Sequence, residues 1–209
     1  MIRVLIVDDH TIVRKGVYYL LEEPDDIQVV GEAGNAEEMF HIIREKSCDV
    51  VLLDISLPGR SGIDALKQLK KTNPEMAVLI LSMYPEDQYA LRVMKSGASG
   101  YLTKESVPEE LIRAIRRIYK GKRYISAGLA EELANHVSGT DSELPHKQLS
   151  DREYEVMMKI VSGESLTQIA EELSLSIKTI STYRSRILDK MNKRNNSELI
   201  KYVIEHKLQ

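Results

Sequence analysis

Polar side chains follow several short apolar runs in the first half of the chain, and their types could carry metal and phosphate chemistry. They are Asp8, Asp9, Asp54, Ser82 and Lys104. Carboxylates held close together repel one another, and a hard divalent cation such as Mg²⁺ relieves that repulsion while keeping waters that phosphate oxygens can replace. A carboxylate can also attack a phosphoryl group, whose oxygens an ammonium group then neutralises. These residue types indicate a Mg²⁺ site for phosphoryl transfer.

The elements that must position these residues are β-branched runs that alternate with segments of helical period. We expect strands at 3–7, 28–32, 50–53, 78–81 and 100–102, and helices near 11–22, 36–46, 62–72, 86–96 and 107–120. This alternation predicts an α/β domain with a flavodoxin-like, five-stranded parallel sheet in the order 2-1-3-4-5. Ligands of such sheets bind beyond the carboxyl ends of the strands. The carboxylates should therefore converge there, although an isolated Asp after a strand is more often a turn or cap residue.

Composition limits the classes of protein that the chain can form. Its 209 residues, 43% of them hydrophobic and 29% charged, suit one large or two small folded domains. The formal net charge of −3 argues against a uniformly basic nucleic-acid coat, so any basic patch must be local. Cys48 has no cysteine partner, and the first apolar run is too short for a signal peptide or a membrane span. We expect a cytoplasmic protein without membrane association.

The second half of the chain has a purely helical pattern. We expect a linker at 121–147, part of it helical near 128–137, and a small domain at 148–209 after a first domain at 1–120. Four helices are expected near 151–162, 166–173, 177–191 and 197–206. Capping boxes begin at Ser150 and Ser165, Gly163 ends the first of these helices, and Ser197 opens the last.

The third of these helices carries a local excess of basic residues. From Ser176 to Arg194 the only acidic residue is Asp189, and a short turn joins this helix to the one before it. That layout is typical of a helix-turn-helix motif, in which a helix rich in Ser, Thr, Lys and Arg contacts DNA. The candidate DNA contacts are Lys178, Thr179, Ser181, Thr182, Tyr183, Arg184, Ser185, Arg186 and Lys190. The alternatives are a solvated charged face or a surface that binds another protein, and Tyr183 either contacts phosphate or packs.

The segments VLIVDDH, VVLLDISLPGRSG, LILS and SGYLTKE resemble the receiver domain of bacterial two-component response regulators, over about residues 1–120. The resemblance implies that Asp54 is the phosphoacceptor and that Lys104 and Ser82 read the phosphoryl group. It implies that Ser82 and Tyr101 form a switch. It also implies that Mg²⁺ is held by Asp8, Asp9, Asp54 and the backbone of Ser56.

The segment LSDREYEVMMKIVSGESLTQIAEELSLSIKTISTYRSRILDKMN resembles the LuxR-type DNA-binding domain, over about residues 148–207. The whole chain therefore resembles a response regulator of the NarL/FixJ class. The resemblance implies phosphorylation of Asp54 by a sensor histidine kinase, homodimerisation, promoter binding and transcription regulation, with RNA polymerase as a further partner. Ser181 and Tyr183 stand where many relatives have a base and a histidine, so the relatives' base contacts do not carry over. An enzyme that transfers phosphate to external substrates is the competing hypothesis, but no P-loop or dinucleotide fingerprint supports it.

Overall fold

The structure is a computed structural model that describes residues 1–106, 108–126, 128–130, 144–206 and 208. The chain divides into two compact units, Met1–Ala130 and Glu131–Gln209. Each unit has its own secondary structure and core, so each is described by itself below. Among the described helices, none combines the length and the apolar character that a membrane crossing requires.

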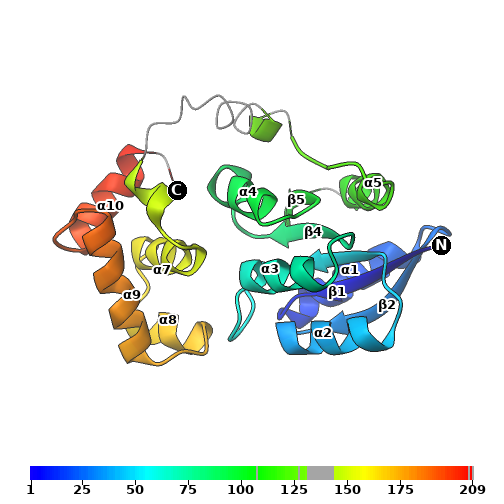
Figure 1. The fold of residues 1–209 in the computed structure, drawn as a ribbon, viewed down its shortest axis with the longest axis horizontal. Helices are drawn as coiled ribbons and strands as arrows, with labels where there is room; N and C mark the ends of the chain where they lie inside the picture. Colours follow the sequence, from blue (N-terminus) through cyan, green and yellow to red (C-terminus); the bar gives the residue numbers. More distant parts are fainter. Residues whose placement is uncertain (107, 127, 131–143, 207, 209) are drawn as a thin grey trace. The chain divides into compact units, whose positions relative to one another are not determined.

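The first unit is a parallel sheet with helices on both faces (Figure 1). Its strands are β1 (Ile2–Val7), β2 (Ile27–Ala33), β3 (Val50–Leu53), β4 (Ala77–Ser82) and β5 (Gly100–Thr103). Its helices are α1 (Thr11–Glu22), α2 (Ala36–Glu45), α3 (Gly62–Thr72), α4 (Glu86–Lys95) and α5 (Pro108–Tyr119). The strand order β2-β1-β3-β4-β5 confirms the predicted topology.

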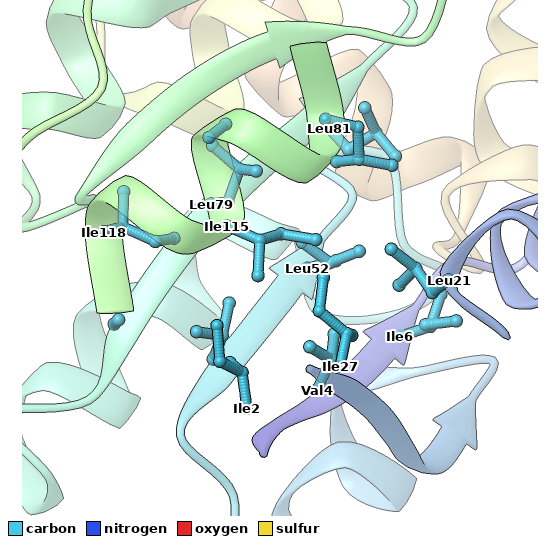
Figure 2. Close-up of a cluster of buried hydrophobic side chains, with 14 of the residues drawn as sticks. Ile2, Val4, Ile6, Leu21, Ile27, Leu52, Leu79, Leu81, Ile115 and Ile118 are labelled. Atoms are coloured by element: carbon cyan, nitrogen blue, oxygen red, sulfur yellow. The ribbon is translucent and has the colours of Figure 1, made fainter. Parts of the chain in front are cut away.

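One face of this sheet packs against α1 and α5 through a continuous cluster of buried aliphatic side chains (Figure 2). Val4, Leu52 and Leu79 come from three neighbouring strands, and Leu21 of α1 and Ile115 of α5 cover them. Because side chains alternate along a strand, the intervening residues, such as Val51 and Ile80, are buried on the opposite face. A sheet buried on both faces explains why the strands are apolar throughout.

The loop between β3 and α3 folds tightly back on the end of β3. Ser61 caps α3 by accepting the N–H of Asp64, and the N–H of Gly62 donates to the carbonyl of Ile55 at 2.8 Å. A Cβ at Gly62 would lie 1.9 Å from the carbonyl oxygen of Asp54, so this position requires glycine. The loop therefore lies directly against Asp54, the residue that follows the central strand β3.

The second unit is helical. It consists of a short 3₁₀ helix, η1 (Pro145–Gln148), followed by α7 (Asp151–Val161), α8 (Leu166–Glu172), α9 (Ile177–Lys190) and α10 (Asn196–Glu205). The capping boxes at Ser150 and Ser165 are confirmed, and Gly163 follows α7 with a positive φ of 92°. The prediction that Ser197 opens the last helix is wrong, because the side chain of Asn195 accepts the N–H of Glu198 and caps α10.

The first part of the predicted linker is hydrogen-bonded to the rest of the first unit. The N–H of Tyr124 donates to the carbonyl of Ser99 at 2.8 Å, and Tyr124 forms a parallel bridge with Gly100 beside β5. The hydroxyl of Tyr124 donates to Glu110 of α5 at 2.8 Å. Residues 128–130 are helical, as expected for the start of the predicted helical part. Its remainder, up to residue 137, lies outside the described residues.

Candidate functional site

The carboxyl ends of the strands bring the predicted polar residues of the first unit to one edge of the sheet. Main-chain hydrogen bonds extend the sheet one residue past its strands: the N–H of Asp54 donates to Val7 and that of Lys104 donates to Ser82, at 2.9 and 2.8 Å. Asp8 is held in the same way by the carbonyl of Ala33. Main-chain hydrogen bonds therefore fix the positions of these residues independently of their side-chain contacts.

Lys104 joins two of the carboxylates. Its Nζ lies 2.6 Å from Oδ2 of Asp8 and 2.7 Å from Oδ2 of Asp54, and all three side chains are buried. Burial raises the pKa of Asp54 to about 6, while the charge and the hydrogen bond of Lys104 act in the opposite direction. Burial by itself lowers the pKa of Lys104, but Asp54 and Asp8 outweigh it and leave that pKa raised. At neutral pH the site therefore holds a carboxylate facing an ammonium group.

The remaining carboxylate oxygens suit a hard divalent cation. Asp8, Asp9, His10 and Asp54 each offer one donor atom, and these atoms all lie within 4.8 Å of one another. Lys104 uses the Oδ2 atoms, whereas Oδ1 of Asp54 accepts only a 3.3 Å hydrogen bond from the N–H of Ser56 among the bonds described. Three carboxylates and one ammonium leave two negative charges to be balanced. This oxygen-rich, doubly negative donor set fits Mg²⁺.

The two residues of the predicted switch share one partner. Ser82 is fully buried, and its Oγ accepts the N–H of Tyr84 at 3.2 Å. The hydroxyl of Tyr101 donates to the carbonyl of Tyr84 at 2.7 Å, and its ring is buried. Burial raises the pKa of Tyr101, so this hydroxyl keeps its proton. Tyr84, which sequence reasoning missed, thus connects both residues to the loop before α4, where its ring stacks on Tyr89.

Sequence reasoning also missed His10 and Gly62. His10 directly follows the two aspartates, and its position in the sequence is the signal that could have identified it. Gly62 lies in the segment that the structure folds against Asp54, but only the close approach of the backbone reveals its role.

In the second unit, most of the candidate DNA contacts lie on the accessible side of α9. Lys178, Ser181, Thr182, Ser185, Arg186 and Lys190 are exposed, and Thr179, Tyr183 and Arg184 are half-buried. The apolar residues Ile180, Ile187, Leu188 and Met191 of the same segment are all buried. A shallow hollow of about 320 Å³ is lined by Ser176, Lys178, Thr179, Thr182, Tyr183 and Arg186. The start of α9 therefore presents hydroxyl and basic groups around one concave surface.

Two of the candidate contacts bond to side chains of other helices in the unit. Lys190 Nζ lies 2.6 Å from Oε2 of Glu153, the same oxygen that accepts the N–H of Ser150 in the capping box of α7. Arg184 donates through Nε to Oδ1 of Asn196 at 2.7 Å. Both contacts tie α9 to neighbouring helices, so these side chains have a structural task that sequence reasoning did not predict.

The fold and the acidic site define a receiver domain, and the helical unit defines a helix-turn-helix domain. Residues 4–116 match the response regulator receiver domain family, and residues 147–203 match the luxR family of bacterial regulatory proteins. The chain therefore belongs to the NarL/FixJ family of two-component response regulators.

Individual relatives agree with this assignment over the full length. Response regulator UvrY of Escherichia coli strain K12 is 38% identical over 209 residues, which cover 100% of this chain and 96% of that protein. Response regulator GacA of Pseudomonas aeruginosa is 37% identical over 207 residues, 99% of this chain and 97% of that protein. Among solved structures, RcsB from Salmonella enterica serovar Typhimurium, bound to promoter rprA in the presence of phosphomimetic BeF₃⁻, is 28% identical with a TM-score of 0.67. That alignment covers 97% of this chain and 98% of RcsB.

Proposed function

We propose that this chain is a cytoplasmic transcription regulator that a sensor histidine kinase phosphorylates on Asp54, which strengthens its dimerisation and its binding to promoter DNA. The observation that carries the proposal is the contact of Lys104 with both Asp8 and Asp54 at the ends of three strands. It places an ionised carboxylate beside an ammonium group that can neutralise an incoming phosphoryl group. The receiver would accept and lose phosphate on itself and would not act on external substrates.

The proposed transfer uses the residues of this site directly. An Asp54 carboxylate oxygen attacks phosphorus and forms a P–O bond, while the P–N bond to the kinase histidine breaks and the leaving imidazole takes up a proton. Lys104 then pairs with a phosphoryl oxygen in place of the Asp54 oxygen that it contacts now. Asp8, Asp9, Asp54 and the backbone of Ser56 would hold Mg²⁺, which when bound supplies further neutralisation of phosphoryl charge.

The response to phosphorylation is proposed to pass through Ser82. A phosphoryl oxygen on Asp54 is a strong acceptor for the hydroxyl proton of Ser82, and it would draw this side chain away from its present position, in which Oγ accepts the N–H of Tyr84. Tyr84 also accepts from Tyr101, so a shift of Ser82 changes the partner of both residues. When the two arrangements of Ser82 and Tyr101 differ in free energy by only a few kcal/mol, phosphorylation can shift the population from one to the other.

The output is proposed to be DNA binding by a dimer. Two copies of α9 would enter successive major grooves of adjacent half-sites, with centres about 34 Å apart. The exposed basic and hydroxyl residues at the start of α9 support this mode of binding, and RcsB, a structural neighbour, is described as bound to promoter DNA. RNA polymerase is the proposed partner downstream of the DNA-bound dimer.

The proposal is tested by phosphorylating the full chain in the presence of Mg²⁺ and a small-molecule phosphodonor. Intact mass and DNA mobility are measured together, with Asp54→Asn as the control. We expect one phosphoryl group on the wild type, none on the variant, and tighter DNA binding only where the group is present. Equal phosphorylation of both proteins, or DNA binding that ignores the phosphoryl group, would contradict the proposal.

A further inference from the structure

His10 contacts the aspartates of the acidic site with an exposed side chain, although the proposed phosphoryl transfer assigns it no role. Its Nδ1 lies 2.8 Å from Oδ1 of Asp9 and 3.2 Å from Oδ1 of Asp8. Together with Asp54, these side chains form the donor group whose atoms all lie within 4.8 Å of one another. The imidazole therefore faces the same space as the carboxylate oxygens.

The spacing of these atoms matches that of ligands around one metal ion. With metal–ligand bonds of about 2.1 Å, neighbouring ligands of an octahedral ion are about 3 Å apart. The separations of Nδ1 from the two carboxylate oxygens, 2.8 and 3.2 Å, bracket that value. Nδ1 is therefore spaced from each of these two oxygens as an adjacent ligand of one ion would be.

The imidazole of His10 does not cap the helix that follows it. His10 is the residue before α1, yet its side chain makes no capping hydrogen bond to that helix. Its own N–H donates to Oδ1 of Asp8 at 2.8 Å, and its Nδ1 lies 3.2 Å from that same oxygen. Lys104 bonds to the Oδ2 atoms of Asp8 and Asp54, whereas His10 contacts the Oδ1 atoms of Asp8 and Asp9.

We propose that His10 is a further metal ligand through Nδ1, and that this nitrogen makes the site prefer Mn²⁺ to Mg²⁺. Carboxylate and carbonyl oxygens suit Mg²⁺ and Mn²⁺ alike, whereas imidazole nitrogen favours transition metals over Mg²⁺. The proposal rests on the proposed function, because it takes the acidic site to be the cation site of the receiver. It adds a ligand beyond the three aspartates and the backbone of Ser56.

The test uses Mn²⁺ as the probe of the full-length protein. Pulsed electron paramagnetic resonance detects ¹⁴N modulation from an imidazole bound to Mn²⁺, and titrations give the Mn²⁺ and Mg²⁺ dissociation constants. The variant is His10→Ala, and the matched control is His41→Ala, because both rings are 60% exposed and His41 lies on α2, away from the strand ends. His10→Phe keeps a ring of similar shape and separates the loss of nitrogen from the loss of packing.

We expect ¹⁴N modulation in the wild type and in His41→Ala, and none in either His10 variant. We also expect Mn²⁺ affinity to fall about tenfold in the His10 variants, with a clearly smaller change for Mg²⁺. Modulation that is absent from the wild type or survives in both His10 variants overturns the inference, as does an equal loss of Mn²⁺ and Mg²⁺ affinity. If Mg²⁺-dependent phosphorylation of Asp54 proceeds without ¹⁴N modulation, His10 alone is misassigned. If the wild type binds neither ion, the proposed cation site fails as well.

Discussion

Lys104 Nζ lies 2.7 Å from Oδ2 of Asp54, which joins the residue after β5 to the residue after β3 across 50 positions of sequence. The same nitrogen reaches Asp8 after β1, so one ammonium group holds the ends of three strands together. The contact stabilises the site at rest, and it also supplies the charge that a phosphoryl group on Asp54 would need. The resting state and the proposed phosphorylated state would therefore compete for the same side chain.

Lys104→Met should destabilise the first unit, because it leaves two buried carboxylates without their cation. We expect a loss of about 3 kcal/mol in the free energy of unfolding, measured by urea unfolding followed by circular dichroism. In an Asp54→Asn background the same substitution should cost clearly less, since one of the two carboxylates is gone. An equal cost in both backgrounds would show that Lys104 and Asp54 are not coupled.

Gly62→Ala should disturb the proposed phosphoacceptor itself, because the added Cβ would lie 1.9 Å from the carbonyl oxygen of Asp54. We expect a loss of about 3 kcal/mol in stability and slower phosphorylation, followed by unfolding and by intact mass. Gly16→Ala is the matched control: Gly16 lies within α1, a Cβ there meets nothing within 4 Å, and alanine should stabilise the helix by about 1 kcal/mol. Similar behaviour of the two variants would argue against the close approach at Gly62.

Tyr101→Phe removes the hydrogen bond to the carbonyl of Tyr84 and leaves the ring in place. Stability should fall by about 1 kcal/mol. Phosphorylation of Asp54 should continue, because Tyr101 makes no described contact with the carboxylates. The gain in DNA affinity on phosphorylation should shrink, and mobility shifts of the phosphorylated and unphosphorylated variant measure it. An undiminished gain would remove Tyr101 from the switch.

Lys178 and Lys190 should behave differently although both are exposed lysines of α9. Lys178→Ala should lower DNA affinity and reduce the slope of log affinity against log salt by about 1, as expected for a lost phosphate contact. Lys190→Ala leaves the buried carboxylate of Glu153 without its cation, so it should lower stability by about 1–3 kcal/mol and leave the salt slope unchanged. A reduced slope for Lys190→Ala would restore it as a phosphate contact.

Glu155 should make the stability of the second unit depend on pH. Burial raises its pKa above the ordinary 4.5, Arg152 opposes that shift only in part, and its Oε1 has no hydrogen-bond partner. The folded state then binds this proton more tightly than the unfolded state does, so the contribution of Glu155 to stability falls as pH rises from about 4.5 through the raised value. Glu155→Gln should remove this component, and urea unfolding of both proteins between about pH 4 and pH 7 measures it. A difference in stability that does not change with pH would contradict the expectation.

The sequence alone determined the elements and which of them carry the polar residues. Alternating apolar runs and helical segments predicted the five strands and the α-helices α1–α5 and α7–α10 to within one residue at either end, but not the 3₁₀ helix η1, which falls largely in the predicted linker. Parallel strands place their carboxyl ends at one edge, so the convergence of Asp8, Asp54 and Lys104 followed from their positions after β1, β3 and β5. These features depend on local periodicity and on the direction of the strands, and both can be read along the chain.

Only the tertiary structure decided which side chains become partners. Tyr84 contacts both Ser82 and Tyr101, His10 turns its imidazole toward two carboxylates, and Lys190 pairs with Glu153 of another helix. Such pairings join residues from different elements or depend on how a loop turns, and hydrophobic periodicity carries no information about them. The sequence therefore predicted where the acidic residues would gather, and packing decided which groups neighbour them.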